Sequence, residues 1–536
     1  MDKIFWVTLV LNIFLFTFLT TSFYLLFSPT ALSPPIKEER FWNLTIIHTN
    51  DVHSRYDQIN SAATDCTKIQ FEAGKCYGGT ARHKTLIDRL RSESKNSLLL
   101  DAGDQFQGTM FFTYYGGEVN SKVLNLLGYN VTAIGNHEFD KGPDVLAAHH
   151  SRLTMPIVCA NINTTLNPTF RKNIKPYHIF KEYDLAVIGY ITDTTGGISN
   201  AGSTLSFYDP IPIVQYYVNQ LREKGIKRIL TISHNGYGPD KELAAKTYGV
   251  AVHIGGHSHS LLANDTTLPD YDLALGPYPT VIRNALGEDT LIVQAFWSGK
   301  YIGHLDVSFD KKGRVVNYTG GPILVDQSIP QDPEVQKLVK QWREPFDKYV
   351  KMVIGEAEDD YDQLNCQRGE CTMGNLITDA MLESRNNSDV HAAFMNAGGI
   401  RAGLLKGNIT RENVVTVLPF DNSLVEIKMT GQNVTDMLES VVSRWENKLS
   451  RKKITNLSKT YKLLTNEFVS NTGDGILPYP IETVPLGNVE VAVEDYIKSQ
   501  YIIKPYLDGR IEDYSLIHEE IKPIDINEPI HFRYQL

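Results

Sequence analysis

Five segments of the sequence end in clusters of acidic, imidazole and amide side chains, and each cluster follows a short apolar run. The runs are residues 44–47, 98–100, 131–134, 229–232 and 250–254. The polar residues after them that could do chemistry are Asp51, His53, Asp104, Asn136, His137, Asp140, His234, His257 and His259. Carboxylate, imidazole and amide groups without a thiolate are ligands suited to zinc, manganese, iron or cobalt. Two divalent ions need about this many ligands.

Spacing within two of the clusters suggests how they bind. Asp51 and His53 are two positions apart, as are His257 and His259. Alternate residues of an extended strand point to the same side, so we expect each pair to hold an ion as a pincer. Asp104 has a second carboxylate oxygen and can bridge two ions. Taken singly, such residues are often structural, because an Asp before Gly is typical of a turn and Asn-His often caps a helix.

Functional groups at the ends of successive strands indicate an α/β fold. A chain of 536 residues is too long for one core and predicts two domains. Its 42% hydrophobic and 21% charged residues are typical of a globular protein and exclude collagen, coiled coil and disorder. The net charge of −10 offers no uniform positive field, so we expect no nucleic-acid partner. For an anionic substrate, a bound metal ion would supply the local attraction.

The order of the clusters resembles the calcineurin-like metallophosphoesterases, whose motifs run Asp-x-His, Gly-Asp, Gly-Asn-His-Glu, His and Gly-His-x-His. Segments 48–55, 101–109 and 136–140 are similar to the 5′-nucleotidase and apyrase branch of that family. The resemblance implies an α/β protein in which residues 40–330 form a dimetal phosphoesterase domain, a β-sandwich flanked by helices. It further implies a linker helix at 331–354 and a smaller α/β nucleotide-recognition domain at 355–536.

The same resemblance implies a role for each site residue. One ion would be held by Asp51, His53, Asp104 and His259, and the other by Asp104, Asn136, His234 and His257. His137 would contact the phosphoryl group or the leaving oxygen, with Asp140 orienting its imidazole. Two cations about 3.5–4 Å apart lower the pKa of a bound water and neutralise the transition state of phosphoryl transfer. We expect zinc, with magnesium, manganese, calcium or cobalt as alternatives.

Three segments of the second domain are similar to the family's nucleotide-recognition segments. They supply Asn396, Arg401, Phe420, Phe468 and Asp474. Two aromatic faces can sandwich a base, and an Asp can accept ribose hydroxyls. Singly, a Phe is more often a core residue and Asp-Gly a turn. The nucleotidases place a phosphate-binding arginine after the first cysteine of the loop 366–371, where this chain has Gln367 followed by Arg368.

A helical pattern separates the two predicted domains. Apolar residues recur at three- and four-residue spacing between 330 and 353, which predicts an amphipathic helix. The helix can pack on one domain or serve as a linker about which the second domain swings.

Features of the N-terminus and the cysteines indicate a location outside the cytosol. Residues 4–27 form an uncharged, largely apolar run, which predicts a signal peptide or signal anchor within residues 1–35. Nine Asn-x-Ser/Thr sequons agree with export and glycosylation. Cys66 with Cys76 and Cys366 with Cys371 form two close pairs, for which disulfides fit better than zinc binding. Cys159 remains as a buried thiol, and no apolar C-terminal tail signals a lipid anchor.

These observations predict a secreted nucleotide phosphohydrolase, with membrane attachment only if the N-terminal segment is an uncleaved anchor. Its partners would be extracellular ATP, ADP and AMP. The missing lipid-anchor signal and Gln367 favour apyrase-type hydrolysis of ATP and ADP to AMP, with 5′-nucleotidase activity on AMP as the alternative. A non-catalytic binder of nucleotides or of a host protein, and a phosphoesterase for nucleotide sugars or cyclic nucleotides, remain as hypotheses.

Overall fold

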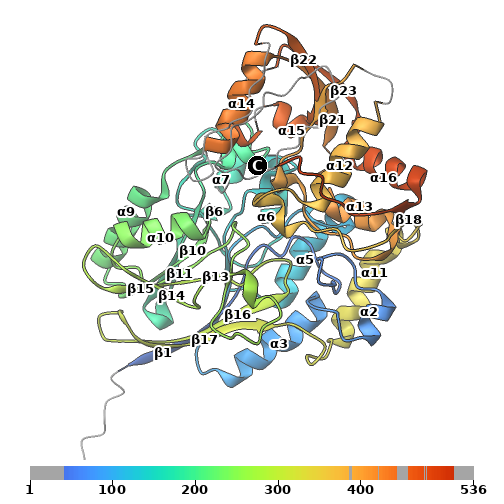
Figure 1. The fold of residues 1–536 in the computed structure, drawn as a ribbon. Helices are drawn as coiled ribbons and strands as arrows, with labels where there is room; N and C mark the ends of the chain where they lie inside the picture. The colour runs from blue at the N-terminus through green and yellow to red at the C-terminus, as the bar shows by residue number, and fades with distance from the viewer. Residues whose placement is uncertain are drawn as a thin grey trace, which may run out of the picture. The chain divides into compact units, whose positions relative to one another are not determined.

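A computed structural model describes residues 41–385, 389–420, 422–443, 457–471, 473–475, 477 and 480–511 (Figure 1). The predicted signal or anchor segment lies outside the described residues. Within the described ranges, no helix is both long enough and apolar enough to cross a bilayer.

Two sheets build the first part of the chain (Figure 1). The seven-stranded sheet runs in the order β17 (Val315–Leu324), β16 (Tyr301–Phe309), β1 (Trp42–Thr49), β2 (Ser97–Asp101), β3 (Val131–Thr132), β4 (Ile157–Val158) and β6 (Ile174–Lys175). The six-stranded sheet runs β14 (Thr280–Arg283), β15 (Asp289–Val293), β11 (Val252–Ile254), β10 (Arg228–His234), β8 (Leu185–Ile191) and β7 (Tyr177–Phe180). Two small pairs are β5 (Ile162–Asn163) with β9 (Ser206–Phe207) and β12 (Leu261–Leu262) with β13 (Ala274–Gly276).

The two sheets pack closely, which confirms the predicted sandwich. Strand β8 is buried along its whole length, as expected for a parallel strand covered on both faces. At Gly189 of β8, an added Cβ would lie 2.1 Å from the carbonyl oxygen of Val158 in β4, so no larger residue fits there. Strands β1, β2 and β3 run parallel, and so do β8, β10, β11 and β15. Their carboxyl ends therefore lie at one edge of each sheet.

Helices cover the sheets because each buries an apolar face against them. Val214, Val218 and Leu221 of α9 (Pro210–Glu223) pack into one cluster with β8. Helices α3 (Thr80–Glu93) and α5 (Gly117–Leu127) pack into another with Ile47 of β1. The remaining helices of this part are α2 (Lys68–Glu72), α4 (Met110–Tyr115), α6 (Pro143–His150), α7 (Pro168–Arg171), α8 (Thr195–Ile198) and α10 (Tyr237–Lys246), with 3₁₀ turns η1 (His137–Phe139), η2 (Lys181–Tyr183) and η3 (Tyr271–Leu273).

The second part is a smaller α/β assembly, as predicted. Its three-stranded sheet is β20 (Gly407–Thr410), β18 (Val353–Ala357) and β24 (Ile502–Ile503), and its four-stranded sheet is β19 (Ala392–Ala393), β22 (Thr460–Asn466), β21 (Ser423–Thr430) and β23 (Glu482–Asn488). Its helices are α12 (Thr372–Glu383), α13 (Arg411–Val417), α14 (Gly431–Ser443), α15 (Glu467–Ser470) and α16 (Val489–Gln500), with η4 (Leu364–Gln367), η5 (Ala397–Gly399) and η6 (Gly473–Gly475). The described residues from Asn43 onward belong to one compact unit, so the domain limits near 330 and 355 stay predictions.

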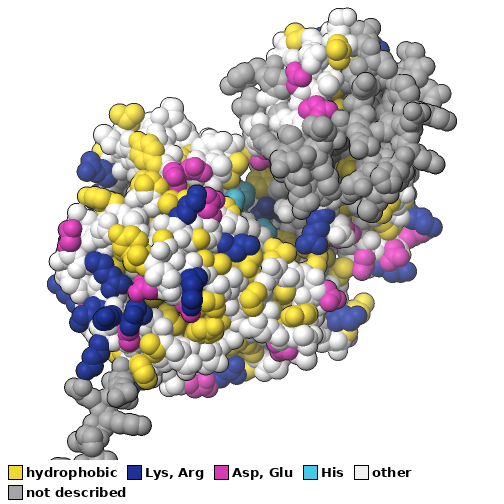
Figure 2. All heavy atoms as spheres, turned by 60° about the vertical axis from the view of Figure 1, so that its left-hand side comes forward, with side chains coloured by type: hydrophobic (Ala, Val, Ile, Leu, Met, Phe, Trp, Pro, Cys, Tyr) yellow, Lys and Arg dark blue, Asp and Glu magenta, His cyan; other side chains and the backbone are white. Residues whose placement is uncertain are grey.

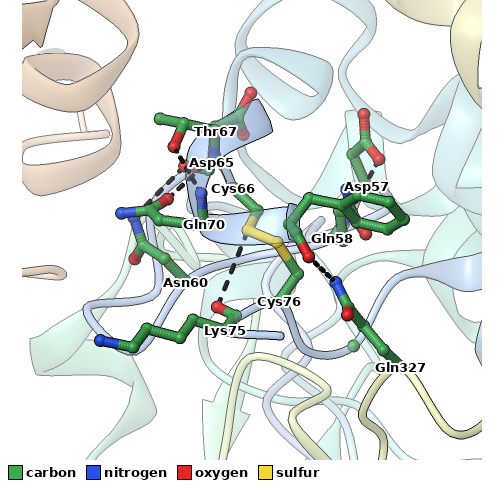
Figure 3. Close-up of a disulfide and its surroundings, with 12 residues drawn as sticks. Asp57, Gln58, Asn60, Asp65, Cys66, Thr67, Gln70, Lys75, Cys76 and Gln327 are labelled. Carbon is green, nitrogen blue, oxygen red and sulfur yellow. Dashed lines mark hydrogen bonds between the residues drawn. A yellow bond between two sulfur atoms is a disulfide. The ribbon is translucent and has the colours of Figure 1, made fainter. Parts of the chain in front are cut away.

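The cysteine predictions are confirmed. Cys66 is bonded to Cys76 beside the capping box of Thr67 and Gln70 that starts α2 (Figure 3). Cys366 is bonded to Cys371, and Cys159 is a buried free thiol. Both disulfides close short loops, the first around α2 and the second between η4 and the start of α12.

The predicted amphipathic helix is present as α11 (Pro333–Val350). Its Asp332 N-cap accepts hydrogen bonds from the amides of Glu334 and Val335, the usual device for starting a helix. Its apolar face packs into the same cluster as α3 and α5. On α11, buried Arg343 pairs with Asp347 in the next turn, with Asp65 beside the first disulfide and with buried Glu412 on α13. Helix α11 therefore contacts both parts of the chain through one guanidinium.

Arg343→Met is expected to destabilise the protein by about 3–5 kcal/mol, because it leaves the buried carboxylate of Glu412 without its cation. Urea unfolding of the disulfide-intact protein measures this. As the matched control, Lys246→Met removes an exposed ion pair with Glu242 and should leave the midpoint unchanged. Equal midpoints for Arg343→Met and the natural chain would show that the buried pair adds nothing to stability.

Candidate metal centre and active site

All nine predicted metal and catalytic side chains lie at the carboxyl ends of five strands. Asp51 and His53 follow β1, Asp104 follows β2, and Asn136, His137 and Asp140 follow β3. His234 is the last residue of β10, and His257 and His259 follow β11. Figure 2 shows histidine side chains in a recess of the surface. The parallel order of the strands explains the convergence, since it brings these ends together.

The ligand atoms form two groups. Asp51, His53 and His259 offer ligand atoms that all lie within 4.8 Å of one another, and so do Asp104, His234 and His257. In the first group, Nε2 of His259 lies 3.1 Å from Nε2 of His53 and 3.3 Å from Oδ1 of Asp51.

Asp104 and Asn136 complete this arrangement. Oδ2 of Asp104 lies 3.0 Å from Nε2 of His234 and 3.9 Å from Nε2 of His53, so the carboxylate stands between the two groups. Oδ1 of Asn136 lies 2.9 Å from Nδ1 of His257 in the second group. These positions fit a bridging Asp104 and an Asn136 ligand.

The pincer expectation was wrong for His257 and His259, which fall into different groups. The alternation argument requires an extended backbone, but the site residues do not adopt one. Asp51, His53, Asp104, His257 and His259 all have φ between +50° and +75°. Left-handed backbone is costly for residues other than glycine and is found mainly at functional sites. It turns successive side chains in directions that strand periodicity cannot predict.

Glu138 has a structural role that the sequence reasoning missed. Its buried carboxylate accepts hydrogen bonds from the amides of Asp104, Gln105, Phe106 and Gly135, at 2.6–3.1 Å. Burial, reinforced by the charge of Asp104, raises the pKa of Glu138 to about 7. One side chain thus joins the loop after β2 to the loop after β3. The only sign of this role in the sequence is the position of Glu138 between His137 and Phe139 in the Asn-His-Glu motif.

The donor set fits bound cations. Nδ1 of His234 lies 2.8 Å from the carbonyl oxygen of Ala102, to which it donates, so in the neutral ring Nε2 carries the lone pair that a cation needs. That Nε2 has no hydrogen-bond partner, although Oδ2 of Asp104 is 3.0 Å away. Burial opposes charge on His234, yet the carboxylates of Asp104 and Asp51 raise its pKa to about 10. A cation between these groups would satisfy the facing lone pairs.

His137 and Asp140 form a hydrogen-bonded pair beside the two groups. Nδ1 of His137 lies 2.9 Å from Oδ2 of Asp140, and its Nε2 lies 3.9 Å from Oδ2 of Asp104. Burial opposes charge on His137, but Asp140 and Asp104 outweigh it and raise its pKa. The arrangement favours an imidazole that holds a proton at Nε2.

Arg401 and Phe420 reach this centre from the second part of the chain. Nη2 of Arg401 lies 3.0 Å from Nε2 of His53, and its guanidinium lies over the ring of Phe420. The ring centroids of Phe420 and His137 are 5.2 Å apart. Two of the predicted substrate residues therefore contact the predicted metal and catalytic residues directly.

The other three predicted substrate residues form a neighbouring group. Asn396 donates to Asp474 at 3.0 Å and accepts from Asn466 at 2.8 Å. Asn466 was not predicted, and it also caps α15, which carries the partly exposed Phe468. Gln367 and Arg368, at the end of η4, both have exposed side chains.

Comparison with known proteins agrees with the site. The profile described as "Calcineurin-like phosphoesterase" matches residues 44–261, and the one described as "5′-nucleotidase, C-terminal domain" matches residues 353–454. A 5′-nucleotidase of Rattus norvegicus is 32% identical, with 91% of this chain and 94% of the relative covered. The chain belongs to the 5′-nucleotidase family. It is a metal-dependent hydrolase with a nucleotidase architecture.

Two further relatives of the family are similar over most of their length. "Protein 5NUC" of Lutzomyia longipalpis is 34% identical, with 88% of this chain and 93% of the relative covered. The crystal structure of a 5′-nucleotidase precursor from Thermus thermophilus matches with a TM-score of 0.81 and 34% identity, covering 88% of this chain and 99% of that chain. The family's dinuclear metal centre corresponds to the two ligand groups found here.

Gly135→Ala is expected to lower bound zinc below two ions per chain, because the new Cβ would lie 2.1 Å from Oδ1 of Asp104. Elemental analysis of purified protein measures the zinc content. Gly197→Ala is the matched control, since no atom lies within 4 Å of its added Cβ. Two retained ions in Gly135→Ala would argue against Asp104 as the shared ligand.

Proposed function

We propose that this protein hydrolyses 5′-nucleoside monophosphates to nucleosides and phosphate. The observation that carries the proposal is the 5.2 Å separation of the Phe420 and His137 rings. A base held at Phe420 would lie beside His137 and the predicted ion ligands, a separation that one phosphate group would span. This supports AMP over the ATP and ADP that the sequence favoured. The similar proteins of Rattus norvegicus and Homo sapiens, both named 5′-nucleotidase, also support it.

The residues divide the work of phosphoryl transfer between them. Asp51, His53, Asp104 and His259 would hold one ion, and Asp104, Asn136, His234 and His257 the other. Bound there, two divalent ions supply Lewis acidity, an activated nucleophile and neutralisation of phosphoryl charge. Zinc suits this set of imidazole and carboxylate ligands.

His137 and Arg401 act on the substrate. Asp140 fixes Nδ1 of His137, so that its Nε2 donates a proton or a hydrogen bond at the leaving oxygen. Arg401, whose guanidinium lies beside His53, binds phosphate oxygens. Phe420 and Phe468 contact the base, while Asp474, held by Asn396, accepts the ribose hydroxyls.

Hydrolysis of ATP and ADP is the second candidate. Gln367 favours it, because an uncharged side chain stands where the nucleotidases place an arginine, and the structure leaves it exposed. Weaker binding of a single phosphate would shift preference toward longer phosphate chains.

We also propose that the protein acts outside the cell. Four of its sequon asparagines, Asn43, Asn264, Asn317 and Asn408, are exposed, as glycan attachment requires. The two disulfides fit an oxidising compartment. Glycosidase treatment of protein from a secretory host should lower its apparent mass.

Phosphate release from AMP, ADP and ATP, measured in parallel with and without chelator, tests the proposed activity. We expect chelator-sensitive release from AMP, because Phe420 lies beside His137 and the predicted ion ligands. Release from ATP and ADP but not AMP would instead support the apyrase alternative. Absence of release from all three with every metal tried would favour a binding protein.

His137→Ala should lower turnover of AMP by about two to four orders of magnitude while the metal content stays near two ions per chain. We expect this result because His137 lies beside Asp104 but belongs to neither ligand group. Steady-state kinetics and elemental analysis measure the two quantities. His178→Ala, on edge strand β7, is the control and should keep full turnover. Unchanged turnover in His137→Ala would remove this residue from the mechanism.

A further inference from the structure

The imidazoles of His53 and His234 are each held by a hydrogen bond from Nδ1 to a backbone carbonyl. Among the residues that the structure describes, His259 lacks such a hydrogen bond. A metal-binding histidine almost always donates its second ring nitrogen to a carbonyl or carboxylate, which fixes the orientation of the ring. Nδ1 of His53 faces the carbonyl oxygen of Phe106 at 3.1 Å, and Nδ1 of His234 faces that of Ala102 at 2.8 Å. Within the described part of the chain, Nδ1 of His259 has no such partner.

A stacked ring takes the place of that hydrogen bond. The indole of Trp297 lies parallel to the imidazole of His259, with an interplanar angle of 4° and ring centroids 5.1 Å apart. This is the offset-stacked arrangement that aromatic pairs prefer. Trp297 is buried, so its ring has little freedom to move away.

Arg55 in turn holds Trp297. Its guanidinium lies 5.7 Å from the centre of the Trp297 ring, within the range of a cation–π contact. Arg55 is 2% exposed and donates to the carbonyl oxygens of His53 and Ala63. Among the described residues, no carboxylate lies within ion-pair distance of the Arg55 guanidinium. Its positive charge therefore faces the ring of Trp297.

We propose that Trp297 is the positioning residue of His259, and that Arg55 keeps Trp297 in place. The ring stack holds the imidazole plane so that Nε2 points at Asp51 and His53, the other members of its group. The inference rests on the ion site of the proposed function, but it concerns the binding of the metal and not the choice of nucleotide.

A calorimetric titration of zinc into the chelator-stripped full-length protein, without nucleotide, tests the proposal. In Trp297→Leu, the zinc affinity of one of the two binding steps should fall about 10–100-fold, because the group that orients a ligand is lost. The affinity of the other step should be unchanged. Trp297→Phe keeps an aromatic face and should restore most of that affinity. The matched control Trp342→Leu removes a partly buried tryptophan on α11 and should leave both steps unchanged. Two unchanged steps in Trp297→Leu would overturn the proposal.

Fluorescence gives a test that does not depend on the folding of Trp297→Leu. Cobalt binding to the stripped natural protein should quench part of the tryptophan emission, because the indole stacks on a metal ligand. That part should disappear in Trp297→Phe and persist in Trp342→Phe. Equal cobalt quenching in Trp297→Phe and the natural chain would overturn the proposal. Failure to release phosphate from AMP would contradict the proposed function, but the zinc-affinity and cobalt-quenching measurements would still test the role of Trp297.

Discussion

The crowding of lone pairs and negative charge at the carboxyl ends of five strands is the constraint on which the rest of the structure depends. Asp51 and Asp104 are buried together with His53 and His234, a combination that water cannot solvate. Buried carboxylates and facing imidazole nitrogens are stable only when cations or protons lie between them. The two ions of the nucleotidase family meet that requirement. Without them, a proton on His234 takes that place, because the carboxylates of Asp104 and Asp51 raise its pKa.

Much of the surrounding structure serves to hold these groups against their own repulsion. Glu138 accepts four backbone amides and so fixes the loop that carries Asp104. Asn50 donates to both Asp51 and the carbonyl of Phe296, and accepts from the amide of Ala295, which ties the loop after β1 to the segment that carries Trp297. The left-handed backbone at five ligand residues is stored strain that these hydrogen bonds sustain.

In the proposed function, substrate recognition depends on a second part of the chain that supplies none of the predicted metal ligands. Arg401 and Phe420 contact His53 and His137, so the proposed phosphate and base binding would take place beside the predicted metal ligands. Arg343 joins the same two parts at a distance from the chemistry, by pairing with carboxylates on either side of α11.

The sequence by itself determined the ligand types, the strands that precede them and both disulfides, because these follow from local patterns of apolar runs and from cysteine spacing. It also indicated the family, through motifs whose order is fixed along the chain. Strand alternation placed His257 and His259 together, whereas the family motifs placed them apart. Only the tertiary structure decided between the two, since positive φ angles cancel the alternation that a strand would impose. The distance from Phe420 to His137 and the stack of Trp297 on His259 were likewise beyond reach. Each joins residues far apart in sequence, whose approach is decided by packing.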